Sequence, residues 1–140
     1  MPLDLSNLER AVQLLDHALA TLDSPDAATR LSVHERETLR AGVIQSFEFT
    51  YELSWTLMQR RIVLDTEDTS VLGLPRKELF RQAARSGLIA KVEPWILYLA
   101  ARNRTVHTYN ADQALAVFDA AKSFLADARA LLTTLRDRHD

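Results

Sequence analysis

The chain has 140 residues and a net charge of −2, with 47% hydrophobic and 26% charged residues, a balance typical of one globular domain. It has no cysteine, which excludes disulfides and thiolate chemistry and fits a reducing cytosol. The longest apolar runs are far shorter than a membrane span, and no signal peptide is predicted. We therefore expect a single cytoplasmic domain over residues 1–140 that does not enter a membrane.

Two helices are predicted in the first half of the chain. Apolar residues at helical spacing place the first over Ser6–Leu22, opened by a capping box in its first four residues, SNLE. A second capping box, formed by Ser32 and Glu35, predicts a helix that continues without proline to about Leu64. Such a helix is roughly 45 Å long, and it is apolar on more than one face. We therefore expect it to pack in its own bundle and also against a second copy, giving a homodimer.

Three further helices are predicted after a polar connection over residues 66–73. Pro75 suits the first turn of a third helix that Gly87 ends, and Pro94 similarly starts a fourth. The segment Asn110–Gln113 resembles a third capping box and opens a fifth helix with its own apolar stripe. No segment has the pattern of a strand. The prediction is an all-α, up-and-down bundle of four or five helices.

The end of the fourth predicted helix carries the pattern R-x4-H-x-Y, formed by Arg102, His107 and Tyr109, with Asn103 directly after the arginine. A guanidinium stays charged and its planar fork suits a phosphate, and an imidazole transfers protons near neutral pH. These groups suffice to bind a phosphodiester and to move protons around it without a metal ion. For an RNA phosphodiester, His107 would move the proton of the 2′-hydroxyl or of the leaving 5′-oxygen, and Arg102 would stabilise charge on the phosphate. Asn103 would orient the imidazole or donate to a phosphate oxygen.

The spacing of this motif does not suit a straight helix. Residues five apart, such as Arg102 and His107, point about 140° away from each other. We therefore expect the site at the fraying end of the helix or across a subunit boundary, with Tyr109 exposed just before the next helix. The alternative, an arginine and a histidine that only cap the last carbonyl groups of the helix, stays open.

A basic segment surrounds the motif. Residues 74–110 contain seven Arg and Lys against two Glu, a net charge of +5. This local charge suits a polyanion such as RNA, and Arg81, Arg85 and Arg104 are candidate phosphate-binding residues. The alternative is an ordinary solvated helix face.

The long second helix carries two further groups of interest. Glu48 and Glu52, four residues apart, share one face and either bind a cation or pair with arginines of another helix. Pairing is favoured, and no metal site is predicted, because no third carboxylate or histidine lies at ligand spacing. The aromatic residues of this helix either stack on bases or pack in the core, and core packing is favoured. They are Phe47, Phe49, Tyr51 and Trp55. A partner or dimer interface is expected to include Phe47, Tyr51 and Trp55 together with the two glutamates.

Three ordered blocks resemble the nucleotidyltransferase substrate-binding-protein-like family of the HEPN superfamily of helical bundles. The blocks are QSFEFTYELSW at residues 45–55, RQAARSGLI at residues 81–89 and RNRTVHTYN at residues 102–110. The resemblance covers about residues 5–135. One departure is Thr56, where many relatives carry a lysine after the tryptophan.

The resemblance implies a dimeric protein encoded beside a minimal nucleotidyltransferase. In one interpretation such a protein is a ribonuclease toxin that uses Arg102 and His107, and the nucleotidyltransferase is an antitoxin that adenylylates Tyr109. In the other interpretation the helical protein is a non-catalytic subunit that binds substrate or nucleotide for the nucleotidyltransferase. No cofactor is implied. The sequence favours the ribonuclease over the binding subunit and over a purely structural dimer.

Overall fold

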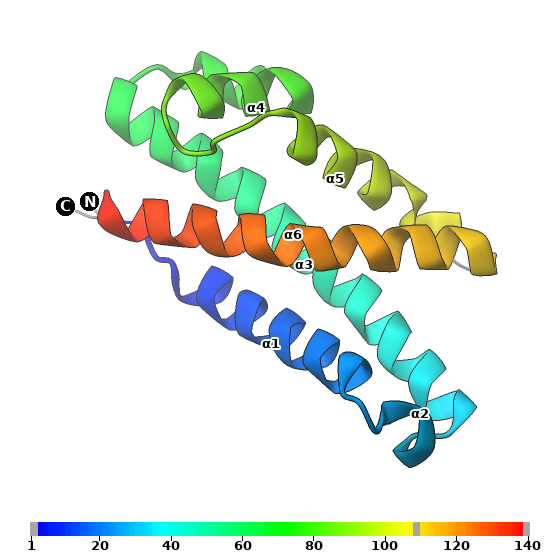
Figure 1. The fold of residues 1–140 in the computed structure, drawn as a ribbon. Helices are drawn as coiled ribbons and strands as arrows, with labels where there is room; N and C mark the ends of the chain where they lie inside the picture. The colour runs from blue at the N-terminus through cyan, green and yellow to red at the C-terminus, as the bar shows by residue number, and fades with distance from the viewer. Residues whose placement is uncertain (1–2, 108–109, 139–140) are drawn as a thin grey trace.

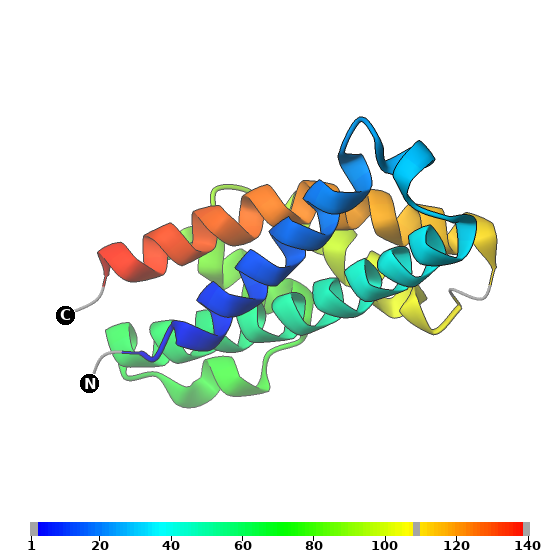
Figure 2. The ribbon, with the colours of Figure 1, turned by 90° about the horizontal axis from the view of Figure 1, so that it is seen from below.

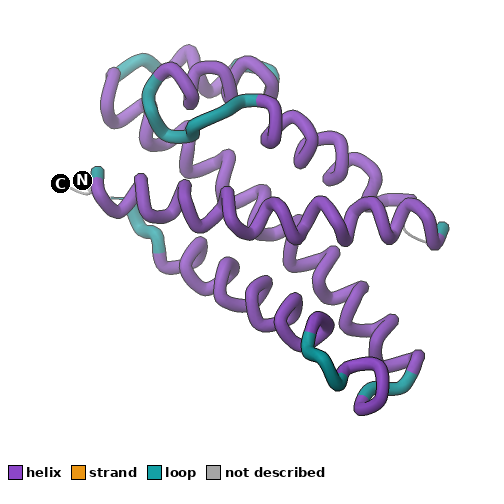
Figure 3. The backbone as a smooth tube through the Cα atoms, viewed as in Figure 1, coloured by secondary structure: helices purple, strands orange, loops and turns teal. Residues whose placement is uncertain are grey.

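The computed structural model describes residues 3–107 and 110–138, which form six α-helices, two short 3-10 helices and no strand. Figure 3 shows helix over almost the whole of this part of the chain, with short connecting loops. The elements are α1 (Ser6–Asp23), α2 (Ala27–Arg30), α3 (Val33–Thr66), η1 (Thr69–Gly73), α4 (Arg76–Arg85), α5 (Glu93–Arg104), η2 (Thr105–His107) and α6 (Ala111–Asp137). The prediction of an all-α bundle is confirmed. No helix in this part of the chain is long and apolar enough to cross a membrane.

Four helices, α1, α3, α5 and α6, alternate in direction along the bundle, and α4 lies in the connection between α3 and α5 (Figure 1). α1 packs against α3 and α6 on one side, and α5 packs against α6 and α3 on the other. The start of α1 and the end of α6 lie at the same end of the molecule (Figure 2), where the guanidinium of Arg136 is 3.2 Å from the carboxylate of Glu9. The opposite end holds the junction between α5 and α6.

Aromatic side chains form the centre of the core and fix α5 against α3 and α6. The ring of Phe124 on α6 has its centroid 5.1–6.4 Å from those of Phe47, Tyr51, Trp95 and Tyr98. Three of these pairs are edge-to-face, the arrangement that the charge distribution of aromatic rings favours. Truncating such a side chain typically destabilises a protein by about 3–5 kcal/mol. This cluster holds the first half of α5 against α3 and α6, and the rigid helix carries its last turn to a defined position along α3.

The local signals in the sequence predict most helix ends. The capping box of Ser32 and Glu35 opens α3 as expected, and Gly87 follows α4 with a positive φ of 77°. The box predicted within Ser6–Glu9 is wrong, because Ser6 donates through its backbone N–H and its hydroxyl to the carboxylate of Asp4, at 3.0 and 2.6 Å. The short helices α2 and η1 were not predicted, since neither is long enough to show a periodic apolar pattern.

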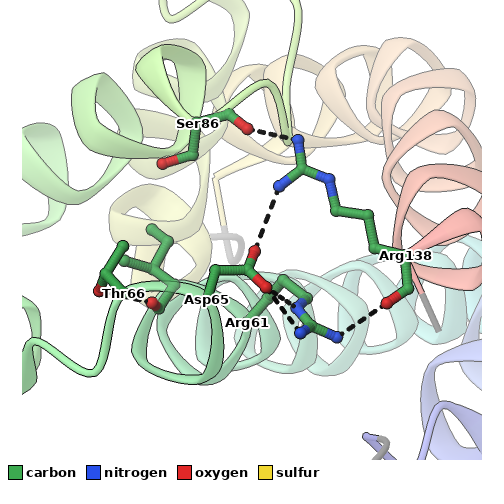
Figure 4. Close-up of polar contacts among 6 residues, drawn as sticks. Arg61, Asp65, Thr66, Ser86 and Arg138 are labelled. Carbon is green, nitrogen blue, oxygen red and sulfur yellow. Dashed lines mark hydrogen bonds and ion pairs between the residues drawn. The ribbon is translucent and has the colours of Figure 1, made fainter. Parts of the chain in front are cut away.

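The C-terminal end of α3 is held by a partly buried polar cluster, drawn in Figure 4. Arg61 is 5% exposed and donates from Nε and Nη2 to one oxygen of Asp65, at 3.0 and 2.6 Å. It also donates to the backbone carbonyl of Arg138 at 3.1 Å. The Arg138 side chain in turn reaches Asp65 and the carbonyl of Ser86. The cluster thus joins the ends of α3, α4 and α6.

Candidate functional site

The R-x4-H motif lies where α5 stops being an α-helix. α5 ends at Arg104, and Thr105–His107 forms a 3-10 turn. The buried Thr105 stabilises this turn by donating its hydroxyl to the carbonyl of Arg102 at 2.8 Å. The expectation that the motif spans a helix end is therefore confirmed. Because the α-helix stops between Arg102 and His107, the angle of about 140° that separates these positions on a straight helix does not apply. Tyr109 lies outside the described residues.

Arg102 is held by two carboxylates of α3. Its Nε donates to Glu52 Oε1 at 3.3 Å, and its Nη1 lies 3.7 Å from Glu48 Oε2. Nη1 also donates to the hydroxyl of Thr105 at 3.3 Å. About a third of the Arg102 side chain, 31%, stays exposed. The prediction that the two glutamates pair with an arginine of another helix is confirmed, and within residues 3–107 and 110–138 no three acidic, histidine or cysteine side chains gather as a metal-binding group.

The contacts of Arg102 continue through α3 to α4. The second oxygen of Glu52, Oε2, accepts a hydrogen bond from the indole Nε1 of Trp55 at 2.9 Å. The guanidinium carbon of Arg76, the first residue of α4, lies 3.4 Å from the centroid of the Trp55 ring, a cation–π contact. Four side chains from three helices thus form one continuous chain of polar contacts that ends at Arg102.

Two of the aromatic side chains proposed for a partner interface lie in the core. Phe47 and Tyr51 are fully buried within the chain, so they offer no surface to a base or to a second protein. The Tyr51 hydroxyl has no hydrogen bond of acceptable geometry among the described residues. Burial raises its pKa to about 12, and the nearby positive charge of Arg76 opposes this rise. By contrast, Phe49 on the outer face of the same helix is 61% exposed.

A groove of about 800 Å³ lies beside Arg102, between α3 and the first turns of α6. We call it the Arg102 groove. One part of its lining is charged, with Arg40, Glu48 and Glu52 beside Arg102. The remainder is largely apolar, and its larger side chains are Ile44, Phe49 and Leu115. The groove therefore offers both a cation and an exposed aromatic ring, the two features that single-stranded nucleic acids and nucleotides contact in proteins.

The other basic candidates lie away from this groove. Arg104, two residues beyond Arg102, is exposed and lines a separate depression between α5 and α6. Arg81 and Arg85 are exposed on α4, where Arg81 pairs with Glu78 and Arg85 donates to Gln82. α4 begins beside Trp55 and runs toward the C-terminal end of α3. That end of α3 lies about 20 Å from Glu52, measured along the axis of α3.

The neighbours of the motif therefore differ from those that the sequence suggested. The structure places Arg102 with the two glutamates and Trp55, and separates it from Arg81, Arg85 and Arg104. Asn103 is exposed on the last turn of α5, where it is next to Arg102 in the chain. Arg40 joins the groove without having been predicted, and Phe49, expected either in the core or stacked on a base, also lines it. The only sequence signal for Arg40 was its position on the same long helix as the two glutamates.

Comparison with known proteins identifies the class to which this bundle belongs. The profile of the family described as "Nucleotidyltransferase substrate binding protein like" matches residues 3–137. A protein of Haemophilus influenzae named "Probable ribonuclease HepT" is 34% identical, over 98% of this chain and 94% of that protein.

Solved structures agree with this assignment. A Haemophilus influenzae structure, described as revealing the fold of a substrate binding domain of a nucleotidyltransferase, superposes with a TM-score of 0.89 at 34% identity. That similarity covers 95% of this chain and 99% of the other. A crystal structure from Thermus thermophilus gives a TM-score of 0.66 at 30% identity, over 92% and 98% of the two chains. The chain belongs to the nucleotidyltransferase substrate-binding-protein-like family, as its three sequence blocks predicted.

Proposed function

We propose that this protein is a metal-independent ribonuclease toxin of the cytosol, controlled by a nucleotidyltransferase partner. The observation that carries the proposal is the place of Arg102, at the end of α5 and five residues before His107, on the wall of a groove with an exposed aromatic ring. The similarity to a protein named as a probable ribonuclease supports it.

The proposed reaction is an internal transesterification. His107 takes the proton of a 2′-hydroxyl or supplies one to the leaving 5′-oxygen, and Asn103 assists at the same phosphate. The 2′-oxygen bonds to phosphorus, the bond from phosphorus to the 5′-oxygen breaks, and that oxygen is protonated. The products are a cyclic phosphate and a 5′-hydroxyl. Arg102 stabilises the negative charge that develops on the phosphate oxygens. No step in this scheme needs a metal ion.

Substitution of the motif tests this proposal. Arg102→Ala and His107→Ala should each lower RNA cleavage by about 10²–10³, the usual effect of removing one charge-stabilising or proton-transfer group. Arg104→Ala is the matched control, because this arginine is exposed on the same helix but lines a different depression. Cleavage should persist in EDTA. Equal losses for all three variants, or activity that EDTA abolishes and a divalent ion restores, would contradict the mechanism.

The proposed active form is a homodimer in which the second copy covers the outer face of α3. The first ten residues of this helix bury no side chain, and Phe49, Leu14 and Leu115 expose 61%, 54% and 48% of their surface. An apolar groove of about 650 Å³ between α1 and α3 adjoins the Arg102 groove through Phe49. Exposed apolar surface of this kind marks protein interfaces. Of the five interface residues expected, Glu48, Glu52 and Trp55 keep solvent-facing surface.

Light scattering at micromolar concentration tests the dimer. The wild-type chain should have twice the mass of one chain, and Phe49→Glu should shift it toward the monomer because a carboxylate replaces an apolar contact. Leu64→Glu, a change at another exposed apolar residue of α3, is the control. A wild-type monomer would overturn this part of the proposal.

The proposed control by the partner is adenylylation of Tyr109. An AMP group so close to Arg102 and His107 in the chain would bring a phosphate that competes with RNA for the guanidinium. After co-expression with the neighbouring nucleotidyltransferase and ATP, the intact mass of the wild type should rise by one or more AMP units, and that of Tyr109→Phe should not. An unmodified chain that the partner still silences would point to inhibition by binding alone.

A second candidate function is a non-catalytic subunit that binds substrate or nucleotide for the nucleotidyltransferase. The Haemophilus influenzae structure favours it, because that structure is described as the fold of a substrate binding domain of a nucleotidyltransferase. Fluorescence titration with ATP and with short RNAs separates the two. Saturable binding of nucleotide without any RNA cleavage would support the binding subunit and contradict the ribonuclease.

A further inference from the structure

We propose that Glu52 is a positioning residue for Arg102, and that it orients the guanidinium so that one nitrogen stays available to a phosphate. This inference rests on the proposed ribonuclease function and adds a residue to its site. Glu52 comes from α3, fifty positions away from Arg102 in the chain, and does not need to touch the RNA itself.

The two oxygens of the Glu52 carboxylate bind different partners. Oε1 accepts from Arg102 Nε at 3.3 Å, and Oε2 accepts from the indole of Trp55 at 2.9 Å. A carboxylate held at both oxygens cannot rotate freely, so the direction in which it holds the guanidinium is fixed. The cation–π contact between Arg76 and the Trp55 ring holds the indole in turn.

Glu52 and Glu48 hold the guanidinium in different ways. Glu48 lies 3.7 Å from Nη1 and makes no hydrogen bond to it, whereas Glu52 makes a directed hydrogen bond to Nε. Both pairs are about one-third exposed or more, where the charge attraction alone is weak. The directed hydrogen bond, rather than the charge, therefore distinguishes the two glutamates.

The N–H groups of Arg102 that are not used within the protein are the ones that can donate to a ligand. Nε is used by Glu52, and Nη1 donates to Thr105. Within the part of the chain that the structure describes, Nη2 has no hydrogen-bond partner. Nη2 therefore keeps both of its N–H groups available to a phosphate oxygen. A guanidinium fixed before the substrate arrives loses less freedom on binding, which is the advantage of a positioning contact.

Steady-state cleavage of a short RNA tests the role of Glu52 in catalysis. Glu52→Ala should lower kcat by about 10-fold to 100-fold, the effect expected when a charge-stabilising group is misplaced. Glu52→Gln should fall between wild type and Ala, because its single carbonyl oxygen can accept from Arg102 or from Trp55 but not from both. Trp55→Phe keeps a ring beneath Arg76 and removes the indole N–H, so it should also lower kcat.

Glu48→Ala is the matched comparison. It removes the same charge from the same face of α3 but no hydrogen bond to Arg102, so kcat should fall clearly less than it does in Glu52→Ala. If Glu52→Ala instead behaves like Glu48→Ala, Glu52 acts only through its charge and the proposal is overturned.

A second measurement does not depend on cleavage. In ¹⁵N NMR spectra, the Arg102 Nε–H signal, assigned by its loss in Arg102→Lys, should exchange slowly with water in wild type and in Glu48→Ala, and rapidly in Glu52→Ala. If the wild type cleaves no RNA but this pattern is seen, the ribonuclease proposal fails and the positioning of Arg102 by Glu52 stands. Unchanged exchange in Glu52→Ala would overturn the positioning role whatever the activity.

Discussion

Removing the carboxylate charge of Asp65 should destabilise the protein through the buried Arg61. The Arg61 side chain is 6% exposed, and two of its nitrogens donate to Asp65 Oδ1 (Figure 4). In Asp65→Asn the side chain keeps its size, but the buried guanidinium of Arg61 loses the negative charge of Asp65. Arg138 loses part of its contact with the same carboxylate.

The expected loss of folding free energy in Asp65→Asn follows from the burial of Arg61. Removing one partner of a buried ion pair typically costs about 3–5 kcal/mol. The Asp65 side chain is itself 35% exposed, so water screens part of the lost attraction, and we expect a loss of stability below this range, about 2–3 kcal/mol. For a chain of 140 residues the unfolding entropy is about 0.3 kcal/mol per degree, so Tm should fall by about 7–10 °C.

Thermal unfolding followed by circular dichroism measures this change. Asp26→Asn is the control, because Asp26 and Arg30 also form an i,i+4 ion pair but their side chains are 61% and 55% exposed. Its loss should change stability by less than about 0.5 kcal/mol. RNA cleavage well below Tm should be unaffected, since the cluster lies at the other end of the bundle from Arg102. Equal shifts in Tm for the two variants would refute the argument from burial.

Two further predictions concern glycine and tyrosine. Gly87→Ala should lower Tm, because φ at this position is +77° and the new Cβ would lie 2.9 Å from Arg138 Nη2. Gly42→Ala, in open space on α3, should instead raise stability by about 0.5–1 kcal/mol. Equal effects of the two substitutions in thermal unfolding would contradict the argument from φ and space. The pKa of Tyr51 is raised from its ordinary value of 10 to about 12, so the folded state keeps the phenol proton at pH values where the unfolded state has lost it. The stability that the neutral Tyr51 hydroxyl contributes is therefore present below pH 10 and is lost as the pH rises from 10 to 12. Tyr51→Phe should lose less stability over that range in urea titrations, and an identical loss would show that the hydroxyl does not matter.

The sequence by itself determined the helices and most of their ends. Capping by Ser32, the positive φ at Gly87 and the side-chain cap of Asn110, which accepts from the backbone of Asp112 and Gln113, depend on residues within four positions of one another. Apolar spacing likewise reflects the geometry of a single helix. The sequence likewise predicted that α5 ends within the motif. Asn103 lies beside Arg102 simply because the two are neighbours in the chain.

Only the tertiary structure decided which side chains meet at the site. The partner of Arg102 is fifty residues away in the chain, and its identity depends on how the aromatic core sets the height of α5 against α3. The same packing buries Phe47 and Tyr51 while leaving Phe49 exposed. It also carries Arg81 and Arg85 away from the motif, because α4 runs toward the other end of the bundle. Contacts between helices depend on rotation and height, and a pattern within one helix fixes neither of these.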